Sequence, residues 1–271
     1  DEARGSFGFS WIAQILPHIE MESLYDVCEV GESNWTARDS ALANRSLLEQ
    51  TPITAVVCPS SATGPFEHEY WDGNWGFQYH VAKTDYAGCK GFFNFYGTPF
   101  SALGTYSNGA LTACSSRKFA AITDGTSNTF LVGECSGTAG PLVSGSKAVE
   151  NQPDWPVKDS GVPGCWLGVR WEPDSANSVI RGVAHKVNDL GNNIRQGFSS
   201  SHPGGANFAL CDGSVQFIPE TIQSNSAGVT FWAGGGANMK SRTDELDAVM
   251  DQVGVYQLLG IRNDGRPVSG F

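Results

Sequence analysis

The chain has 271 residues, of which 40% are hydrophobic and 17% charged, so it carries enough apolar material for a sizeable core. Its 17 basic and 28 acidic residues give a formal net charge of -11. With no basic cluster, this balance argues against nucleic acid and anionic membrane surfaces as partners. No stretch reaches the roughly 20 apolar residues that span a bilayer. We expect one elaborated domain over residues 1–271.

Glycine and proline, at 33 and 13 residues, indicate long loops and more strand than helix. There is no C-x-x-C pair and no His at ligand spacing, which argues against a zinc finger or ribbon. Scattered cysteines instead indicate an exported protein with some disulfides, and their odd number leaves at least one thiol free or paired outside the chain. They are Cys28, Cys58, Cys89, Cys114, Cys135, Cys165 and Cys211.

The first 60 residues contain one helical and one extended pattern. In SWIAQILPHIEMESLYD, residues 10–26, the apolar spacing predicts a short helix to residue 15 or 16 with Ser10 as N-cap. Pro17 starts a second set of turns, because the residue before a proline avoids helical backbone. Further on, TPITAVVCPSS predicts a strand over Ile53–Cys58 that ends at Pro59.

Residues 63–109 form a segment rich in aromatic residues and glycine, without lasting periodicity. Two interpretations compete. The rings could pack on one another and on a sheet as a long insertion, which we favour, or they could form a stacking surface for sugars or other flat solutes. The candidate stacking residues are Trp71, Trp75, Phe77, Tyr79, Phe92, Phe93 and Tyr96.

The stretch RKFAAITDGTSNTFLVGEC predicts two strands, Phe119–Ile122 and Thr129–Val132, joined by a polar turn. Oxygen atoms of Asp124, Thr126 and Asn128 in that turn could hold Ca²⁺, which prefers oxygen ligands. The D-x-D-x-D-G spacing of a calcium loop is absent, so calcium is a secondary hypothesis. Otherwise we expect no cofactor.

Residues 199–222, SSSHPGGANFALCDGSVQFIPETI, predict a hairpin with a two-residue type I′ turn at Asp212–Gly213. One face then carries Ala206, Phe208, Leu210, Val215, Phe217 and Pro219. The predicted cross-strand neighbours are Cys211 with Ser214, Leu210 with Val215, and Phe208 with Phe217. Ten residues of strand would separate His202 from Asp212 by up to roughly 30 Å, so His202 is expected to anchor the far end by bonding backbone or a carboxylate from another segment.

Near the C-terminus, TDELDAVMDQVGVYQLLG has apolar residues on roughly one helical face. Acidic residues lie in its first turn, where the helix dipole favours them. We predict a helix with Thr243 as N-cap, which Gly254 could divide.

His202, nine intervening residues and Asp212–Gly213 resemble the H-x9-D-G signature of prepilin-type proteins that are abundant in planctomycete bacteria. Other segments match that family in order: SWIAQILPHIEMESLY, VVCPSS, TDYAGCKG and ITDGTSNTFLVGE. The tail IRNDGRPVSGF departs from the family pattern at Asp264 and Arg266. The residues taken as the structural signature are His202, Gly204, Gly205, Asp212, Gly213, Asp124, Gly125, Ser127, Asn128 and Glu134.

The resemblance implies the exported α+β head of a type IV pilin-like precursor, with an antiparallel sheet, long loops and a few short helices. We expect the leader and the hydrophobic N-terminal helix, through which such proteins contact the membrane, to be absent from this chain. The leading hypothesis is a non-enzymatic, extracellular or cell-surface subunit of a filament, appendage or secretion pseudopilus that assembles with like subunits. The alternative is a surface module that binds carbohydrate or another solute. An enzyme ranks third, because no G-x-S-x-G, H-E-x-x-H or P-loop motif occurs.

Overall fold

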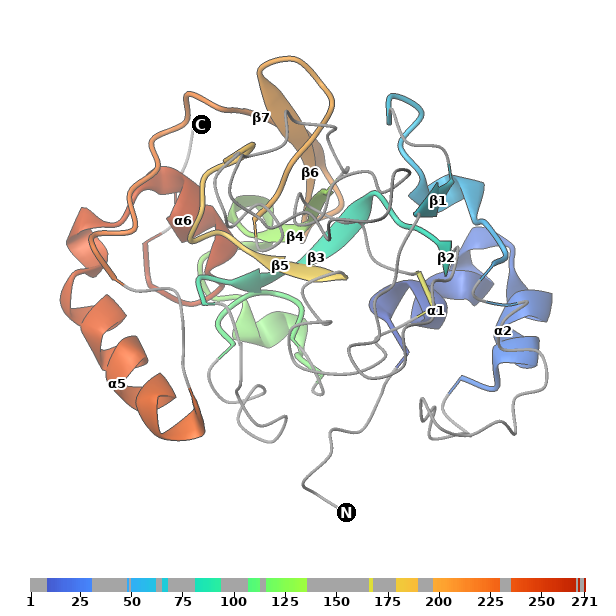
Figure 1. Cartoon of the computed structure of the whole chain (residues 1–271). Helices are drawn as coiled ribbons and strands as arrows, with labels where there is room; N and C mark the ends of the chain where they lie inside the picture. The colour runs from blue at the N-terminus through green and yellow to red at the C-terminus, as the bar shows by residue number, and fades with distance from the viewer. Residues whose placement is uncertain are drawn as a thin grey trace, which may run out of the picture.

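A computed structural model of the chain describes the following residues: 9–30, 48, 50–61, 65–67, 81–93, 107–112, 116–135, 166–167, 179–189, 197–229, 235–266, 268 and 271. Figure 1 shows α1 and α2 on one side of a central sheet and α5 and α6 on the other.

The central sheet has five strands in the order β5-β3-β4-β6-β7. Their bounds are β3 Tyr86–Gly91, β4 Phe130–Glu134, β5 Ile180–Gly182, β6 Gly205–Leu210 and β7 Val215–Pro219. All neighbours are antiparallel except β5, which runs parallel to β3. A separate two-stranded ribbon pairs β1 (Phe66–Glu67) with β2 (Val81–Ala82). The predicted α+β class with a mostly antiparallel sheet and short helices is confirmed.

The N-terminal helices follow the prediction closely. α1 covers Trp11–Ile15, and the side chain of Ser10 caps it by accepting from two backbone N–H groups. A 3-10 helix, η1 (Leu16–Ile19), holds Pro17 in its first turn, and α2 follows at Glu22–Cys28. Apolar side chains of this region pack around the buried indole of Trp166.

The main core lies between one face of the sheet and α6 (Val255–Gly260). The rings of Phe130 and Phe208 stack at 4.2 Å between centroids, and Phe198 meets Phe208 edge-on at 4.9 Å. Tyr256 of α6 meets Phe208 edge-on at 6.2 Å. Offset and edge-to-face contacts of this kind add to the stabilisation that burial supplies.

The 199–222 hairpin forms, but its turn is not the predicted type. Leu210 N donates to Ser214 O and Gly213 N donates to Leu210 O, which gives a three-residue loop, and only Gly213 has positive φ, at +87°. This is a type I turn closed by a glycine bulge. The loop is held by segment 126–129, because Cys211 N donates to Thr129 O and Asp212 N to Thr126 O.

The extra loop residue shifts the register by one and reverses the faces of β7. Phe208 pairs with Gln216, and Phe217 pairs with Asn207. A shift of one residue moves every side chain of a strand to the other face. Val215 and Phe217 are therefore 68% and 49% exposed, and the prediction that they share the buried face with Phe208 is wrong.

Two further predicted strands are wrong. Residues 53–58 contain a 3-10 helix, η2 (Thr54–Val56), rather than a strand, and Val56 O accepts the N–H of Asp85, the residue before β3. Phe119–Ile122 likewise contains a 3-10 helix, η3 (Phe119–Ala121). The ring of Phe119 is 71% exposed, so no burial favours a strand there. Another 3-10 helix, η4 (Thr126–Asn128), leads into β4.

The C-terminal helix begins earlier than predicted. α5 covers Gly235–Ala248, so Thr243 lies inside the helix rather than at its start. Ion pairs one turn apart, Lys240–Asp244 and Arg242–Glu245, stabilise this polar helix. A 3-10 helix, η6 (Met250–Gln252), follows, and Gly254 is the N-cap of α6, as the predicted division required. Among the described residues, no helix combines the length and apolarity needed to cross a bilayer.

Candidate functional site

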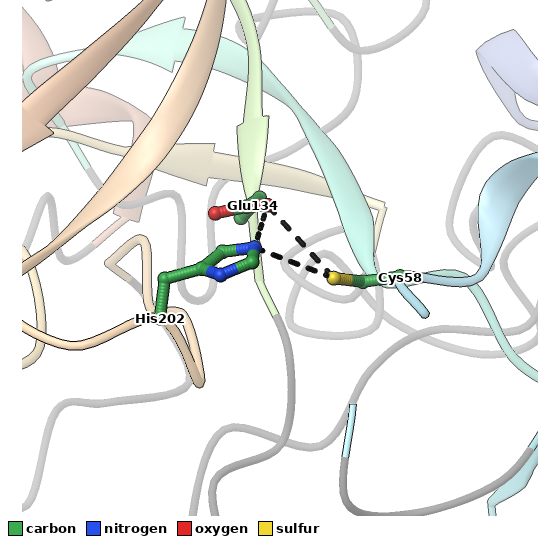
Figure 2. A group of neighbouring side chains, drawn as sticks. All are labelled: Cys58, Glu134 and His202. Carbon is green, nitrogen blue, oxygen red and sulfur yellow. Dashed lines mark hydrogen bonds and ion pairs between the residues drawn. The ribbon is translucent and has the colours of Figure 1, made fainter. Parts of the chain in front are cut away.

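Three segments that are far apart in the sequence bring Cys58, Glu134 and His202 together (Figure 2). The His202 Nε2 atom lies 3.2 Å from Glu134 Oε1 and 3.7 Å from Cys58 Sγ. The Sγ and Oε1 atoms are 3.9 Å apart. The three ligand atoms all lie within 4.8 Å of one another, and among the described residues this is the group of three or more side chains that could hold a metal ion. It also provides the carboxylate from another segment that His202 was expected to contact.

Hydrogen bonds hold the thiol and the carboxylate of this cluster in place. Cys58 follows η2, and its N–H donates to Asp85 Oδ2 at 2.9 Å. Glu134 ends β4, and its carboxylate accepts from the backbone N–H of Asn207 at 2.7 Å and from Asn207 Nδ2 at 3.1 Å. Both carboxylates are buried, so these bonds offset the cost of removing them from water.

The imidazole reaches the cluster from the loop that precedes β6. The backbone of His202 is held in place because its N–H donates to Ser200 Oγ at 3.1 Å. The side chain of His202 is 30% exposed, whereas that of Glu134 is 3% exposed. The cluster therefore opens to solvent on the His202 side.

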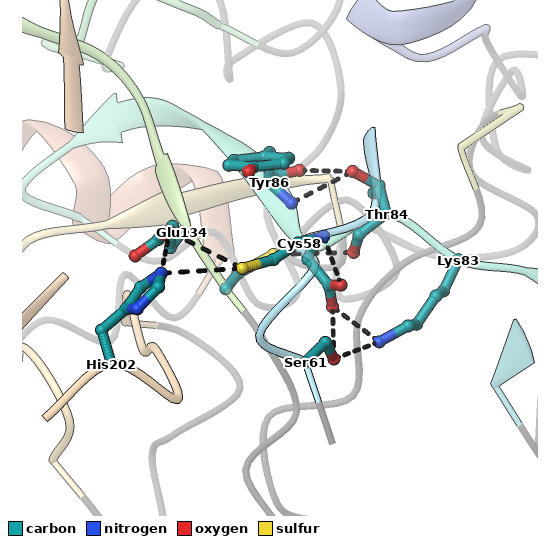
Figure 3. Close-up of polar contacts among 9 residues, drawn as sticks. Cys58, Ser61, Lys83, Thr84, Tyr86, Glu134 and His202 are labelled. Carbon is teal, nitrogen blue, oxygen red and sulfur yellow. Dashed lines mark hydrogen bonds and ion pairs between the residues drawn. The ribbon is translucent and has the colours of Figure 1, made fainter. Parts of the chain in front are cut away.

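A buried ion pair supports the Cys58 side of the cluster (Figure 3). Lys83 Nζ lies 2.7 Å from Asp85 Oδ1, and both side chains are fully buried. Lys83 also donates to Ser61 Oγ at 2.7 Å, and Ser61 Oγ lies 3.5 Å from the same carboxylate. Asp85 thus joins the ion pair to the backbone of Cys58.

Burial raises the pKa of a tyrosine beside the cluster and of four cysteines in the chain. Burial, followed by the nearby Cys58 and Glu134, raises the pKa of Tyr86 to about 12. Burial raises the pKa of Cys89 to about 12 and that of Cys28, Cys135 and Cys211 to about 11. These four thiols therefore stay protonated at neutral pH, as is typical of buried, unreactive cysteines.

The five described cysteines, which are these four and Cys58, are free and buried. The expectation of disulfides therefore gains no support from the described part of the chain. Cys114 and Cys165 lie outside the described residues.

The turn proposed for calcium serves the C-terminal segment instead. Both carboxylate oxygens of Asp124 accept backbone N–H groups, from Asp264 at 2.7 Å and from Gly265 at 2.8 Å. Thr126 accepts from the hairpin through its backbone oxygen, and Asn128 Nδ2 donates to Asp124 O at 3.2 Å. These contacts explain Asp124 as an anchor, and the calcium hypothesis gains no support from them.

The remaining signature residues shape the hairpin and the turn before β4. A Cβ atom at Gly205 would lie 2.2 Å from Ile218 O, so only glycine fits there. Gly125, Gly204 and Gly213 have positive φ, which glycine adopts readily. Asp212 is exposed and accepts from Ser214 N and Oγ at 2.9 and 2.7 Å. Asp212 is therefore a turn residue, and strand β6 separates it from His202. Ser127 lies in η4.

The aromatic residues proposed for ligand stacking divide into two sets. Phe92 and Phe93 are fully buried and meet edge-on at 5.2 Å, so they pack in the core and offer no face to a ligand. The others lie outside the described residues: Trp71, Trp75, Phe77, Tyr79 and Tyr96.

Sequence analysis missed Cys58 as a partner of the signature residues. Cys58 lies 76 residues from Glu134 and 144 from His202, so no ligand spacing could reveal the group. The available signal was indirect: Cys58, Glu134 and His202 fall in three of the segments that carry the family resemblance.

A family model described as a protein of unknown function (DUF1559) matches residues 1–225. That match includes the whole Cys58, Glu134 and His202 cluster. No curated protein and no solved structure matches the chain.

Proposed function

We propose that this chain, which belongs to the DUF1559 family of proteins of unknown function, is a pilin-like structural subunit. In this proposal it acts outside the cytoplasm, without enzymatic activity, in a surface filament, appendage or secretion pseudopilus, and it assembles with like subunits. The sequence resemblance to prepilin-type proteins motivates the proposal, and the mostly antiparallel α+β fold is compatible with it.

The observation that carries the proposal is the exposed edge strand β7. It is the last strand of the sheet, and among the described strands it pairs with β6 alone. Its outward face carries Val215 and Phe217, both large apolar side chains exposed to solvent. β5, at the opposite edge, is buried throughout. An exposed apolar edge strand favours pairing with another chain, and proteins that remain monomeric usually avoid it.

The two exposed side chains of β7 would supply part of the free energy of a contact between subunits. Burial of a Val or Phe side chain contributes about 1.5–3 kcal/mol when complete, and main-chain hydrogen bonds of an added strand contribute further. If β7 contacts a different surface of the next subunit, the assembly stays open and forms a filament. If two copies of β7 pair with each other, the assembly closes as a dimer.

The test is cryo-electron microscopy of native surface material together with sedimentation of the purified chain and the variant V215S/F217S. We expect filaments that contain this protein, self-association of the purified chain, and at least about tenfold weaker association of the variant. F119S is the control, because the Phe119 side chain is more exposed than that of Phe217 but lies on η3. Dispersed monomers in native material, or equal effects of both variants, would refute the proposal.

The alternative function, binding of carbohydrate or another solute, has no specific observation in its favour. Its two described candidate residues, Phe92 and Phe93, are fully buried.

A further inference from the structure

We propose that Cys58, Glu134 and His202 bind a Zn²⁺ ion. They offer a sulfur, a carboxylate oxygen and an imidazole nitrogen, which are the three ligand types that zinc binds in proteins. The side chains point toward one another from the segment after η2, from the end of β4 and from the loop before β6 (Figure 2).

The spacing of the three ligand atoms fits one tetrahedral ion. With Zn–N and Zn–O bonds of about 2.1 Å and a Zn–S bond of about 2.3 Å, tetrahedral angles place N and O about 3.4 Å apart and S about 3.6 Å from either. The observed separations are 3.2 Å for N and O, 3.7 Å for S and N, and 3.9 Å for S and O. Shifts of a few tenths of an ångström would complete the site.

The orientation of His202 distinguishes an ion site from a catalytic triad. In a triad the nucleophile and the acid contact opposite nitrogens of the imidazole ring, so that the proton moves along a chain. Here Cys58 and Glu134 both face the same atom, Nε2. A single nitrogen cannot orient itself toward the acid and accept a thiol proton at once, whereas one ion can take all three ligands.

The hydrogen bonds that hold Glu134 and Cys58 are of the kind found around metal ligands. Ligand carboxylates in metal sites are themselves held by outer hydrogen bonds, and Asn207 donates twice to Glu134. Asp85 holds the backbone of Cys58. The 30% exposure of the His202 side chain gives an ion access from solvent, and water would supply the fourth ligand.

The donor set favours zinc over calcium and magnesium. Those hard cations take oxygen ligands, six to eight of them for calcium, while thiolate and imidazole select zinc and neighbouring transition metals. Binding converts the Cys58 thiol to a thiolate, forms a Zn–S bond and releases one proton to solvent. The ion would tie three distant segments together and so stabilise the fold.

The experiment titrates the chelator-treated chain with Zn²⁺ by calorimetry and with Co²⁺ by absorption spectroscopy. We expect one ion per chain, a thiolate-to-Co²⁺ charge-transfer band, and a Tm increase of about 5 °C at a hundredfold excess of Zn²⁺ over Kd. C58S should abolish the charge-transfer band, and C58S and H202Q should each weaken binding at least about 100-fold. N207A, which removes one bond to Glu134, should weaken binding about 10-fold.

Matched controls separate the site from general effects of thiols and histidines. C211S and H185Q change the same residue types at buried or half-buried positions outside the cluster, and both should bind Zn²⁺ as the parent chain does. Circular dichroism of each metal-free variant establishes that it folds. If a variant does not fold, the Co²⁺ spectrum of the parent chain still decides whether a thiolate is a ligand.

Three results would overturn the inference: no stoichiometric binding by the folded parent chain, a Co²⁺ spectrum without a thiolate band, or equal affinity for Ca²⁺ and Zn²⁺. The inference does not depend on the proposed structural role. Zinc binding by a monomeric protein would leave the site intact and refute assembly, while filaments without zinc would do the reverse.

Discussion

Removal of one charge from the buried Lys83–Asp85 pair should destabilise the protein severely. In the variant K83M the aliphatic part of the side chain is retained, but the Asp85 carboxylate loses the ammonium group that lies 2.7 Å away. Both side chains are fully buried, and an uncompensated buried charge typically costs about 3–5 kcal/mol. Since domains are stable by about 5–15 kcal/mol in total, this loss is a large fraction of the free energy of unfolding.

Neutralising the partner should reverse much of that loss. In K83M/D85N the amide oxygen can still accept the N–H of Cys58, which Asp85 accepts at 2.9 Å, and no unpaired charge remains. We expect the double variant to lie within about 2 kcal/mol of the parent chain. The two single variants and the double variant then give a coupling energy between the residues.

The assay is urea denaturation of the parent chain and the variants at pH 7, with ΔG from the midpoint and slope. K240M is the matched control, because Lys240 pairs with Asp244 at 2.8 Å but the two side chains are 73% and 62% exposed, and such pairs contribute about 0–1 kcal/mol. If K83M costs less than 1 kcal/mol, or no more than K240M, the argument from burial is refuted.

Two further predictions concern other parts of the chain. Burial, followed by the nearby Asp124, raises the pKa of Asp264 from 3.8 to about 7, so the folded state holds this proton between about pH 4 and 7 while the unfolded state has lost it. The contribution of Asp264 to the free energy of unfolding is therefore fully present below about pH 4 and is lost as the pH rises through 7. Because Asp264 is only half-buried, we expect the free energy of unfolding of D264N to gain only about 1–2 kcal/mol relative to the parent chain between pH 4 and 8. Parallel pH profiles of the two chains in denaturation experiments would contradict this. G133A should cost about 1–3 kcal/mol by overpacking, since a Cβ atom there would lie 2.5 Å from Phe208 and 2.6 Å from Phe198; an unchanged Tm would show that the rings can move.

Local signals in the sequence were sufficient where the structure depends on local contacts. The Ser10 cap, the turn at Pro17 and the division at Gly254 were predicted because each depends on the backbone of a few adjacent residues. The hairpin itself also follows from alternation and turn residues, whereas the α+β class was implied by the family resemblance. The exclusion of a direct contact between His202 and Asp212 followed from the rise of a strand.

Two of the predicted strands are wrong because strand propensity is not enough without a neighbouring strand to pair with. Ile53–Cys58 and Phe119–Ile122 have strand-like composition, but both contain a 3-10 helix. A strand is stabilised by cross-strand pairs and by burial of one face. Whether a segment finds a neighbouring strand is decided elsewhere in the chain, so composition alone cannot show it.

The sequence by itself determined the start of the first helix, the turn at Pro17 and a hairpin whose loop contains Asp212–Gly213. Only the tertiary structure decided the register of that hairpin, because bonds from its loop to Thr126 and Thr129 select three loop residues and so turn Val215 and Phe217 outward. It likewise decided that Cys58, Glu134 and His202 meet. Residues 76 and 144 positions apart come together through the packing of whole segments, and no local pattern encodes that distance.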